Sequence, residues 1–140
     1  MRFERPEDLD RELRAILSFV SRFDGSFKKL GENDIDYLVY KNDNPLCYVE
    51  VKGRKRSVSK SYPLPLAARK AVKLSDKRLN PVVLWSCDDG IIYGEIRKLY
   101  GNFEWGGRKP RDGSVNDGEL MIYYSPQEEL KCIKYIDLPF

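Results

Sequence analysis

The feature that most constrains the fold is a turn sequence between two runs of strand-forming residues. Residues 35–40 and 46–51 are rich in branched and aromatic side chains, which favour β-strands. Between them stands the run Asn42-Asp43-Asn44-Pro45, a combination that is typical of tight turns. Two strands joined by such a turn predict a β-hairpin, which fixes the spatial relation of the residues on it.

The register of this hairpin brings two acidic residues together. If the turn is centred on Asp43, opposed residues have numbers that sum to 86, and Asp36 lies opposite Glu50. Because side chains alternate across a strand, Glu50 and Lys52 project from one face. A slip of one residue would turn these side chains to the other face, so the prediction depends on the register.

Helix and strand patterns continue along the chain. Apolar residues at helical spacing predict a first helix from Pro6 to about Arg22 and a second from about Leu66 to Leu79. Strands are expected over 27–30, 82–86, 91–96, 121–124 and 132–136, with a basic connection over 53–62 and a long glycine-rich, basic loop over 101–118. The order of helices and strands indicates a mixed α/β domain.

Composition narrows both the class of protein and its chemistry. The chain has 140 residues, of which 41% are hydrophobic, and this suits one globular domain with one core. Its formal charge of +3 does not by itself indicate nucleic-acid binding. The chain contains no histidine. Histidine-dependent nucleophilic catalysis and histidine metal sites are therefore excluded, which leaves carboxylate and lysine chemistry with a hard ion such as Mg²⁺.

The cysteines and the apolar runs indicate the cellular setting. Cys47, Cys87 and Cys132 are far apart and form no CxxC pair, so we expect buried free thiols and a reducing, cytoplasmic location. No apolar run approaches the roughly 20 residues that a membrane helix needs. The sequence therefore predicts a soluble protein without a membrane partner.

The paired acids of the hairpin suit a metal ion. The Cβ atoms of opposed residues lie about 4.5–5.5 Å apart, where two carboxylates repel each other unless a cation lies between them. Asp36 and Glu50 can converge there on a divalent ion that holds oxygens at about 2.0–2.1 Å. Such an ion activates water and neutralises charge on a phosphoryl oxygen, and Lys52 could orient that water. The ordinary alternative is an exposed cross-strand ion cluster with a structural role only.

With these residues placed, the sequence resembles the PD-(D/E)XK nuclease superfamily. Asp36, a turn and the run Glu50-Val51-Lys52 match its signature of an Asp followed by (D/E)-x-K, although Ile35 replaces the proline that often precedes the Asp. The resemblance covers residues 7–97 and is closest to small Holliday-junction resolvases and phage nucleases. It implies an α/β fold over residues 1–140, a single restriction-endonuclease-like domain whose central mixed sheet is flanked by helices in the order α-β-β-β-α-β. Residues 98–140 would add extra C-terminal strands and the basic glycine-rich loop.

The resemblance also implies roles for particular residues. Asp36 and Glu50 would bind Mg²⁺, or Mn²⁺ in its place, the Val51 carbonyl would add a ligand, and Lys52 would assist the attacking water. On the first helix Glu12 would support a water at the metal, with Glu7 and Asp10 as competing candidates; each could also be a plain surface acid. On the second helix, where the superfamily often has a basic residue near the site, lie Arg69, Lys70 and Lys73, of which Lys70 and Lys73 are one turn apart. Position beside the proposed site adds Arg54, Lys55, Arg56 and Lys60 as contacts to the DNA backbone, and composition adds Arg108, Lys109 and Arg111 in the glycine-rich loop. A solvated basic surface is the ordinary alternative for the first two sets, and a dimer contact is the alternative for the loop.

The resulting hypothesis is a metal-dependent endonuclease that hydrolyses DNA phosphodiester bonds, with selectivity for branched or junction DNA as one option. RNA stays open as a substrate, and a homodimer stays open as the assembly. Three alternatives remain: an exonuclease, a non-catalytic nucleic-acid-binding protein on the same fold, and a phage accessory module that binds another protein. If the protein is viral, the host cytoplasm is the expected location.

Overall fold

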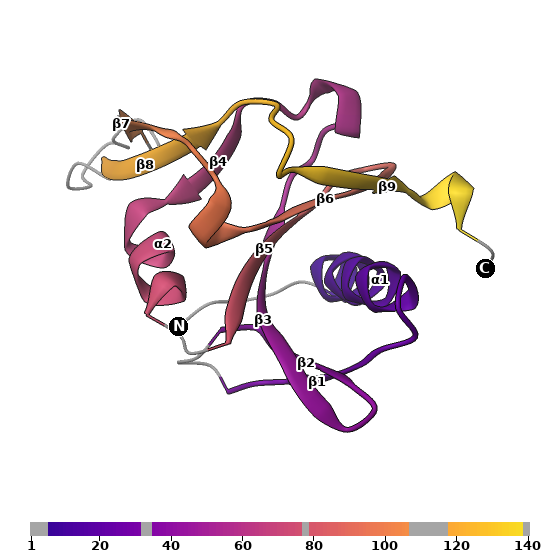
Figure 1. Cartoon of the computed structure of the whole chain (residues 1–140). Helices are drawn as coiled ribbons and strands as arrows, with labels where there is room; N and C mark the ends of the chain where they lie inside the picture. Colours follow the sequence, from indigo (N-terminus) through magenta and orange to yellow (C-terminus); the bar gives the residue numbers. More distant parts are fainter. Residues whose placement is uncertain (1–5, 32–34, 77–78, 107–117, 139–140) are drawn as a thin grey trace.

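Two sheets and two helices make up the part of the chain that the structure describes. The computed structural model describes residues 6–31, 35–76, 79–106 and 118–138, with side chains from Asp10 onward. In Figure 1, α1 (Pro6–Ser21) lies on one side of the larger sheet and α2 (Ala68–Ser75) lies on the other. The larger sheet has six strands in the order β1-β2-β3-β5-β6-β9, and the smaller sheet has three in the order β4-β8-β7.

The order of the elements along the chain defines the fold class. The larger sheet contains β1 (Ser26–Lys29), β2 (Tyr37–Lys41), β3 (Asn44–Gly53), β5 (Asn80–Ser86), β6 (Gly90–Glu95) and β9 (Lys131–Lys134). The smaller sheet contains β4 (Leu64–Ala67), β7 (Asn102–Gly106) and β8 (Glu119–Tyr124), and single 3₁₀ turns lie at η1 (Val58–Lys60), η2 (Ile96–Lys98) and η3 (Tyr135–Asp137). The strands β3 and β5 are parallel, while the other pairs are antiparallel. This mixed sheet, with the order α1-β1-β2-β3-α2-β5 interrupted only by η1 and β4, is a restriction-endonuclease-like domain and confirms the predicted fold class.

The first helix covers one face of the larger sheet with an apolar stripe. Ala15, Ile16, Phe19 and Val20 are buried, and their spacing places them on one side of the helix. They form one core cluster with side chains of the sheet, among them Val49 on β3. The predicted first helix is thus confirmed. No helix among the described residues is long and apolar enough to cross a membrane.

The predicted hairpin forms with a two-residue turn. Asn42 and Asp43 have φ angles of 51° and 65°, the left-handed backbone that a tight hairpin turn requires and that Asn and Asp adopt more readily than most residues. The residues on either side of the turn, Lys41 and Asn44, pair with each other. The run that predicted a turn therefore marks its position correctly, although Asn44 already belongs to β3.

A β-bulge then sets the register on which the acids depend. Tyr37 pairs with Val49, so their numbers sum to 86 as predicted, whereas the pair next to the turn sums to 85. The register shifts because Leu46 is an additional residue on β3. The same register extended by one residue brings Asp36 opposite Glu50. Without the bulge, Glu50 would point to the other face relative to Asp36.

The segment that follows β3 differs from its prediction at one end. The second helix was expected from about Leu66, but β4 occupies Leu64–Ala67 and α2 begins at Ala68. Pro65 holds only Leu64, the residue before it, in an extended conformation, whereas Leu66 and Ala67 are extended because they pair with Ile122 and Met121 of β8. β4 is also fixed by pairing with β8 and by the indole of Trp85, whose Nε1 donates to the Pro65 carbonyl at 2.9 Å.

The C-terminal part of the chain builds most of the smaller sheet. β7 occupies Asn102–Gly106, where a loop was expected, and pairs with β8 in an antiparallel register. The rest of that predicted loop, residues 107–117, lies outside the described residues. The predicted strands over 121–124 and 132–136 are found as β8 and β9, although η3 replaces the end of the second one.

The thiols follow their prediction only in part. All three cysteines are free, and Cys47 and Cys87 are buried. Cys132, however, is exposed, because β9 is the edge strand of the larger sheet and this residue is on its uncovered side. The expectation of three buried thiols was therefore wrong for Cys132. Aromatic residues of the strands pack in the sheet: Tyr37, Trp85 and Tyr93 are buried, and Tyr48 packs against a core cluster.

Candidate metal and catalytic site

Asp36 lies immediately before β2, where its side chain joins the hydrogen bonding of the hairpin. Its Oδ2 accepts a hydrogen bond from the backbone N–H of Val51 at 2.9 Å. Its backbone carbonyl accepts one from the N–H of Leu30 at 2.9 Å. These bonds hold the Asp36 carboxylate against the peptide that joins Glu50 to Val51.

Glu50 lies in the middle of β3, and its side chain is almost completely buried. Only 2% of the residue is exposed. Its Oε1 lies 3.1 Å from Nζ of Lys70 on α2 and 3.7 Å from Nζ of Lys52 on the same strand. The two lysine side chains are 23% and 27% exposed. Two partly exposed ammonium groups therefore lie beside the buried carboxylate.

The charges of this cluster explain how Glu50 is tolerated at the edge of the core. An ionised carboxylate is costly to bury unless a positive group compensates it at close range. Lys70 and Lys52 provide that compensation on the same oxygen. The neighbouring strand residue on this face, Tyr48, packs against apolar core side chains, so little water surrounds the carboxylate. Two positive groups are therefore held close to one oxygen atom of Glu50.

The donor set suits a hard divalent ion. Asp36 and Glu50 offer carboxylate oxygens, which Mg²⁺ prefers. The N–H and the C=O of one strand residue point toward the same neighbouring strand, so the Val51 carbonyl faces the Asp36 side as its N–H does. Within residues 6–31, 35–76, 79–106 and 118–138, no three His, Cys, Asp or Glu side chains gather into a metal cage. An ion at this place would therefore take two carboxylates and a carbonyl, with water completing its shell.

The acids of α1 have a different relation to this site. α1 packs against the face of β3 that carries Val49, whereas Glu50 projects from the opposite face toward α2. Glu12 is half-buried on α1, and its support of a metal-site water stays a prediction. The competing candidate Asp10 lines a small hollow beside the C-terminal segment. The side chain of the third candidate, Glu7, lies outside the described residues.

Arg54, the first base after β3, is bound to the protein itself. Its Nε and Nη2 donate to the carbonyl of Ser61 at 3.0 and 2.8 Å, and Nη2 also donates to that of Pro63 at 3.3 Å. Desolvation lowers the pKa of this guanidinium, and the nearby Arg56 lowers it further. Arg54 therefore closes the loop that contains η1 and leaves fewer donors for phosphate than the sequence suggested.

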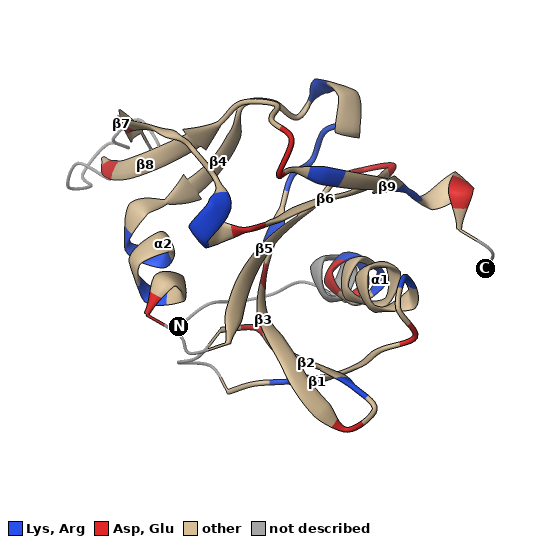
Figure 2. Cartoon of the chain, viewed as in Figure 1, with Lys and Arg blue, Asp and Glu red and all other residues tan. Residues whose placement is uncertain are grey.

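The other predicted bases have several positions. Lys55, Arg56 and Lys60 are exposed in the connection after β3, and Figure 2 shows basic residues both in this connection and on α2. Lys70 contacts Glu50, while Lys73 is half-buried one turn further along α2. Arg108, Lys109 and Arg111 lie outside the described residues. Contact of any of these bases with nucleic acid stays a prediction.

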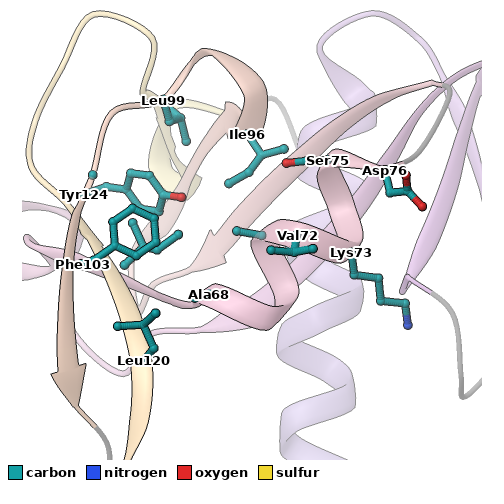
Figure 3. Close-up of a pocket in the computed structure, with 13 residues that line it drawn as sticks. Ala68, Val72, Lys73, Ser75, Asp76, Ile96, Leu99, Phe103, Leu120 and Tyr124 are labelled. Atoms are coloured by element: carbon teal, nitrogen blue, oxygen red, sulfur yellow. The ribbon is translucent and has the colours of Figure 1, made fainter.

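A separate apolar hollow lies on the other flank of α2. It has a volume of about 720 Å³ and runs between α2, η2 and the strands β7 and β8 (Figure 3). Val72 and Phe103 line it and are 71% and 64% exposed. In Figure 3 the Lys73 side chain extends away from Phe103. The sequence did not predict this hollow, because its walls come from four elements that meet only in the folded chain.

The contact between Lys70 and Glu50 is the feature of the site that the sequence left unassigned. The second helix offered three bases near the expected site, Arg69, Lys70 and Lys73. The available signal was the buried stripe of α2, formed by Ala68, Ala71 and Leu74, because Lys70 directly precedes a buried position. That signal identifies which face of the helix is buried. Only the structure, in which α2 begins at Ala68, shows that Lys70 is the base that contacts Glu50.

An Asp before the first hairpin strand, an E-x-K run on the central strand and a helix on each face of a mixed sheet together define the PD-(D/E)XK class of nuclease folds. A comparison with protein families agrees with this class. The model of the family described as "Phage putative PDDEXK endonuclease" matches residues 1–131, and the chain belongs to this family. The match extends beyond residue 97, so most of the C-terminal region, for which the sequence suggested no counterpart, belongs to the family pattern. No curated protein and no solved structure matches the chain.

Proposed function

We propose that the protein is a metal-dependent endonuclease that hydrolyses DNA phosphodiester bonds at the Asp36–Glu50–Lys52 site. The observation that carries this proposal is the Asp36 carboxylate bound to the peptide next to Glu50, with two ammonium groups gathered on the Glu50 carboxylate. Membership in a family of phage endonucleases supports the same chemistry. The cation is Mg²⁺, with Mn²⁺ able to replace it.

Each residue of the site has a separate task in this proposal. Asp36 and Glu50 bind the ion, and the Val51 carbonyl adds a third protein oxygen. The bound ion supplies an activated water and neutralises charge that develops on the phosphate. Lys52 stays protonated beside the two carboxylates, so it positions the water and the phosphate rather than removing a proton.

The substrate is held by the bases around the end of β3. Lys55, Arg56 and Lys60 are exposed on the connection that leaves the catalytic strand, and so they suit the phosphate backbone. Such contacts are independent of sequence and weaken steeply as salt increases. We therefore expect recognition of DNA structure, such as a branch, before recognition of a base sequence.

The test is a cleavage assay on supercoiled, linear and branched DNA, each with Mg²⁺, Mn²⁺ or EDTA. We expect metal-dependent cutting of the supercoiled circle, which an exonuclease cannot start from. Glu50→Gln and Lys52→Ala should each lower the rate by about 10²–10³-fold, the usual effect of losing one group that stabilises the transition state. Glu119→Gln is the matched control, because Glu119 pairs with Arg69 outside the site.

Three results would contradict the proposal. Cutting that persists in EDTA would exclude the metal mechanism, and equal cutting by Glu50→Gln would exclude this site. Salt-dependent DNA binding without cutting in any metal would favour the non-catalytic DNA-binding alternative.

A further inference from the structure

The ion pair between Lys70 and Glu50 joins the catalytic strand β3 to α2, the helix in the chain segment that connects β3 to β5. Nζ of Lys70 lies 3.1 Å from Oε1 of Glu50, closer than the 3.7 Å of Lys52, which belongs to the signature run. Both ammonium groups lie next to the same oxygen atom, Oε1 of Glu50. In the free protein, therefore, a lysine from α2 is the nearest cation to the carboxylate that the proposed function assigns to the metal.

The site is balanced in charge before any ion enters it. Asp36 and Glu50 contribute two negative charges, and Lys52 and Lys70 contribute two positive charges. A divalent ion would add two more positive charges next to a carboxylate that is 2% exposed, where water screens repulsion poorly. Retaining both ammonium groups at the carboxylate would then be unfavourable, so binding of the ion should expel one of them.

Lys70 is the ammonium group that is positioned to leave. Lys52 is anchored two residues from Glu50 on the same strand, so its charge cannot move far from the carboxylate. Like Lys52, Lys70 has a flexible four-carbon chain and a partly exposed side chain (27% and 23% exposed, respectively), but Lys70 reaches Glu50 from another element. It can therefore turn toward solvent without moving a core side chain, which makes it the exchangeable cation of the pair.

We propose that Lys70 occupies the place of the metal at Glu50 in the free protein and is displaced when the ion binds. This inference rests on the proposed function, because it requires that Glu50 is a metal ligand. Lys70 is then a positioning residue: it stabilises the buried carboxylate in the absence of metal and lowers metal affinity by competition. The displaced ammonium becomes available to a DNA phosphate, so metal and DNA should favour each other's binding.

The test measures metal binding without DNA, by calorimetric titration of the full chain with Mn²⁺. Lys70→Met removes the competing charge, and we expect about tenfold tighter binding than in the wild-type protein, as one unit charge leaves a poorly screened site. Lys70→Gln, which keeps a hydrogen-bond donor without the charge, should behave similarly. Arg69→Met is the matched control, because it removes a positive charge from the same helix that pairs with Glu119 instead. The control should stay within about twofold of wild type, since its charge is exposed and screened.

Thermal unfolding gives an independent readout. Without metal, Lys70→Met should melt below the wild-type protein, because Glu50 then depends on Lys52 alone. Added Mn²⁺ should raise the melting temperature of Lys70→Met by more than it raises that of wild type, because tighter ligand binding stabilises the folded state further. Lys70→Gln supplies the same comparison if Lys70→Met does not fold.

Glu50→Gln separates failure of this inference from failure of the proposed function. If wild-type protein binds Mn²⁺ and Glu50→Gln does not, the metal site stands; equal or weaker binding by the Lys70 variants would then overturn the exchange alone. If wild-type protein shows no Glu50-dependent binding, the metal site and the exchange are both overturned. Tighter binding by Arg69→Met to the same extent would reduce the effect to general electrostatics and would also overturn the exchange.

Discussion

The two faces of β3 carry opposite chemistry although a helix covers each of them. Toward α1, the side chains of Cys47, Val49 and Val51 are 7%, 0% and 5% exposed and belong to one apolar cluster. Toward α2, the alternate positions include Glu50 and Lys52, which form an ion cluster. The alternation of one strand thus gives one face to stability and the other to the proposed chemistry.

The coverings of the two faces differ in a way that matches this division. α1 has 16 residues and buries a continuous apolar stripe, whereas α2 has 8 residues and contributes both apolar side chains and Lys70. A short helix leaves room for partly exposed lysines at its edge. Burial on the polar face therefore depends on specific charge partners, while burial on the apolar face depends only on exclusion of water.

The largest effect should come from placing a charge on the apolar face. Val49→Glu would bury a carboxylate where Val49 is 0% exposed among apolar neighbours of the α1 cluster. A buried charge without a partner costs several kcal/mol, so we expect a loss of at least about 4 kcal/mol, much of the stability of a typical domain. Urea unfolding followed by circular dichroism measures this loss.

The matched variant for that experiment is Glu50→Gln, one residue along the strand. It keeps the shape of a side chain already accommodated on the polar face, so we expect a folded protein that melts cooperatively. If Val49→Glu is as stable as Glu50→Gln, the two faces are not chemically distinct and the division proposed for β3 is wrong.

The position of the acids could be predicted from the sequence, but for an incomplete reason. The register of Asp36 with Glu50 followed from a turn assumed to be centred on Asp43. The turn is instead centred between Asn42 and Asp43, about half a residue earlier than assumed. The bulge at Leu46 then restores the predicted pairing of Asp36 with Glu50. A bulge leaves no local sequence signal as clear as Asn-Asp in a turn, because any residue can be the additional one.

Features that depend on residues distant in the sequence could not be predicted from the sequence alone. Leu64–Ala67 is a strand because β8 pairs with it, and β8 lies more than 50 residues later in the chain. Lys70 reaches Glu50 only because α2 starts after that strand. Cys132 resembles a buried strand residue, but its exposure depends on β9 being an edge. In each case the sequence indicates the local preference, while the tertiary neighbours decide the outcome.

The second effect concerns Cys47, a titratable side chain of β3 on the apolar face. Burial raises the pKa of Cys47 from 9.0 to about 12, with a further contribution from the charge of Glu95. Because the pKa is raised in the folded state, the contribution to stability is complete below pH 9 and decreases as pH rises toward 12. At pH 10.5 the cost of keeping Cys47 protonated is about 2 kcal/mol, from about 1.4 kcal/mol per pH unit.

The measurement compares wild-type protein with Cys47→Ala by urea unfolding at pH 8 and pH 10.5. Wild type should lose about 2 kcal/mol more than the variant over this interval. Burial also raises the pKa of Tyr124, to about 12, but that residue is present in both proteins and its effect cancels in the difference. Equal losses in the two proteins would show that Cys47 is not enclosed as the apolar face requires.

The smallest effect concerns the two arginines that continue the polar face beyond the end of β3. Arg54 donates to the carbonyls of Ser61 and Pro63, whereas Arg56 is exposed. Arg54→Ala should therefore lower stability by about 1.5–3 kcal/mol, the range for hydrogen bonds that involve a charged group. Arg56→Ala should change stability by less than about 0.5 kcal/mol. If Arg56 contacts a phosphate as proposed, the variant should also lower the slope of log affinity against log salt by about one. Urea unfolding and DNA titrations from 50 to 200 mM salt, the range of about fourfold over which such slopes are measured, separate the two roles. In the opposite result, Arg54→Ala would change the salt slope and Arg56→Ala would change the stability. DNA would then contact Arg54, the first basic residue after β3, and the roles assigned to the two arginines would be wrong.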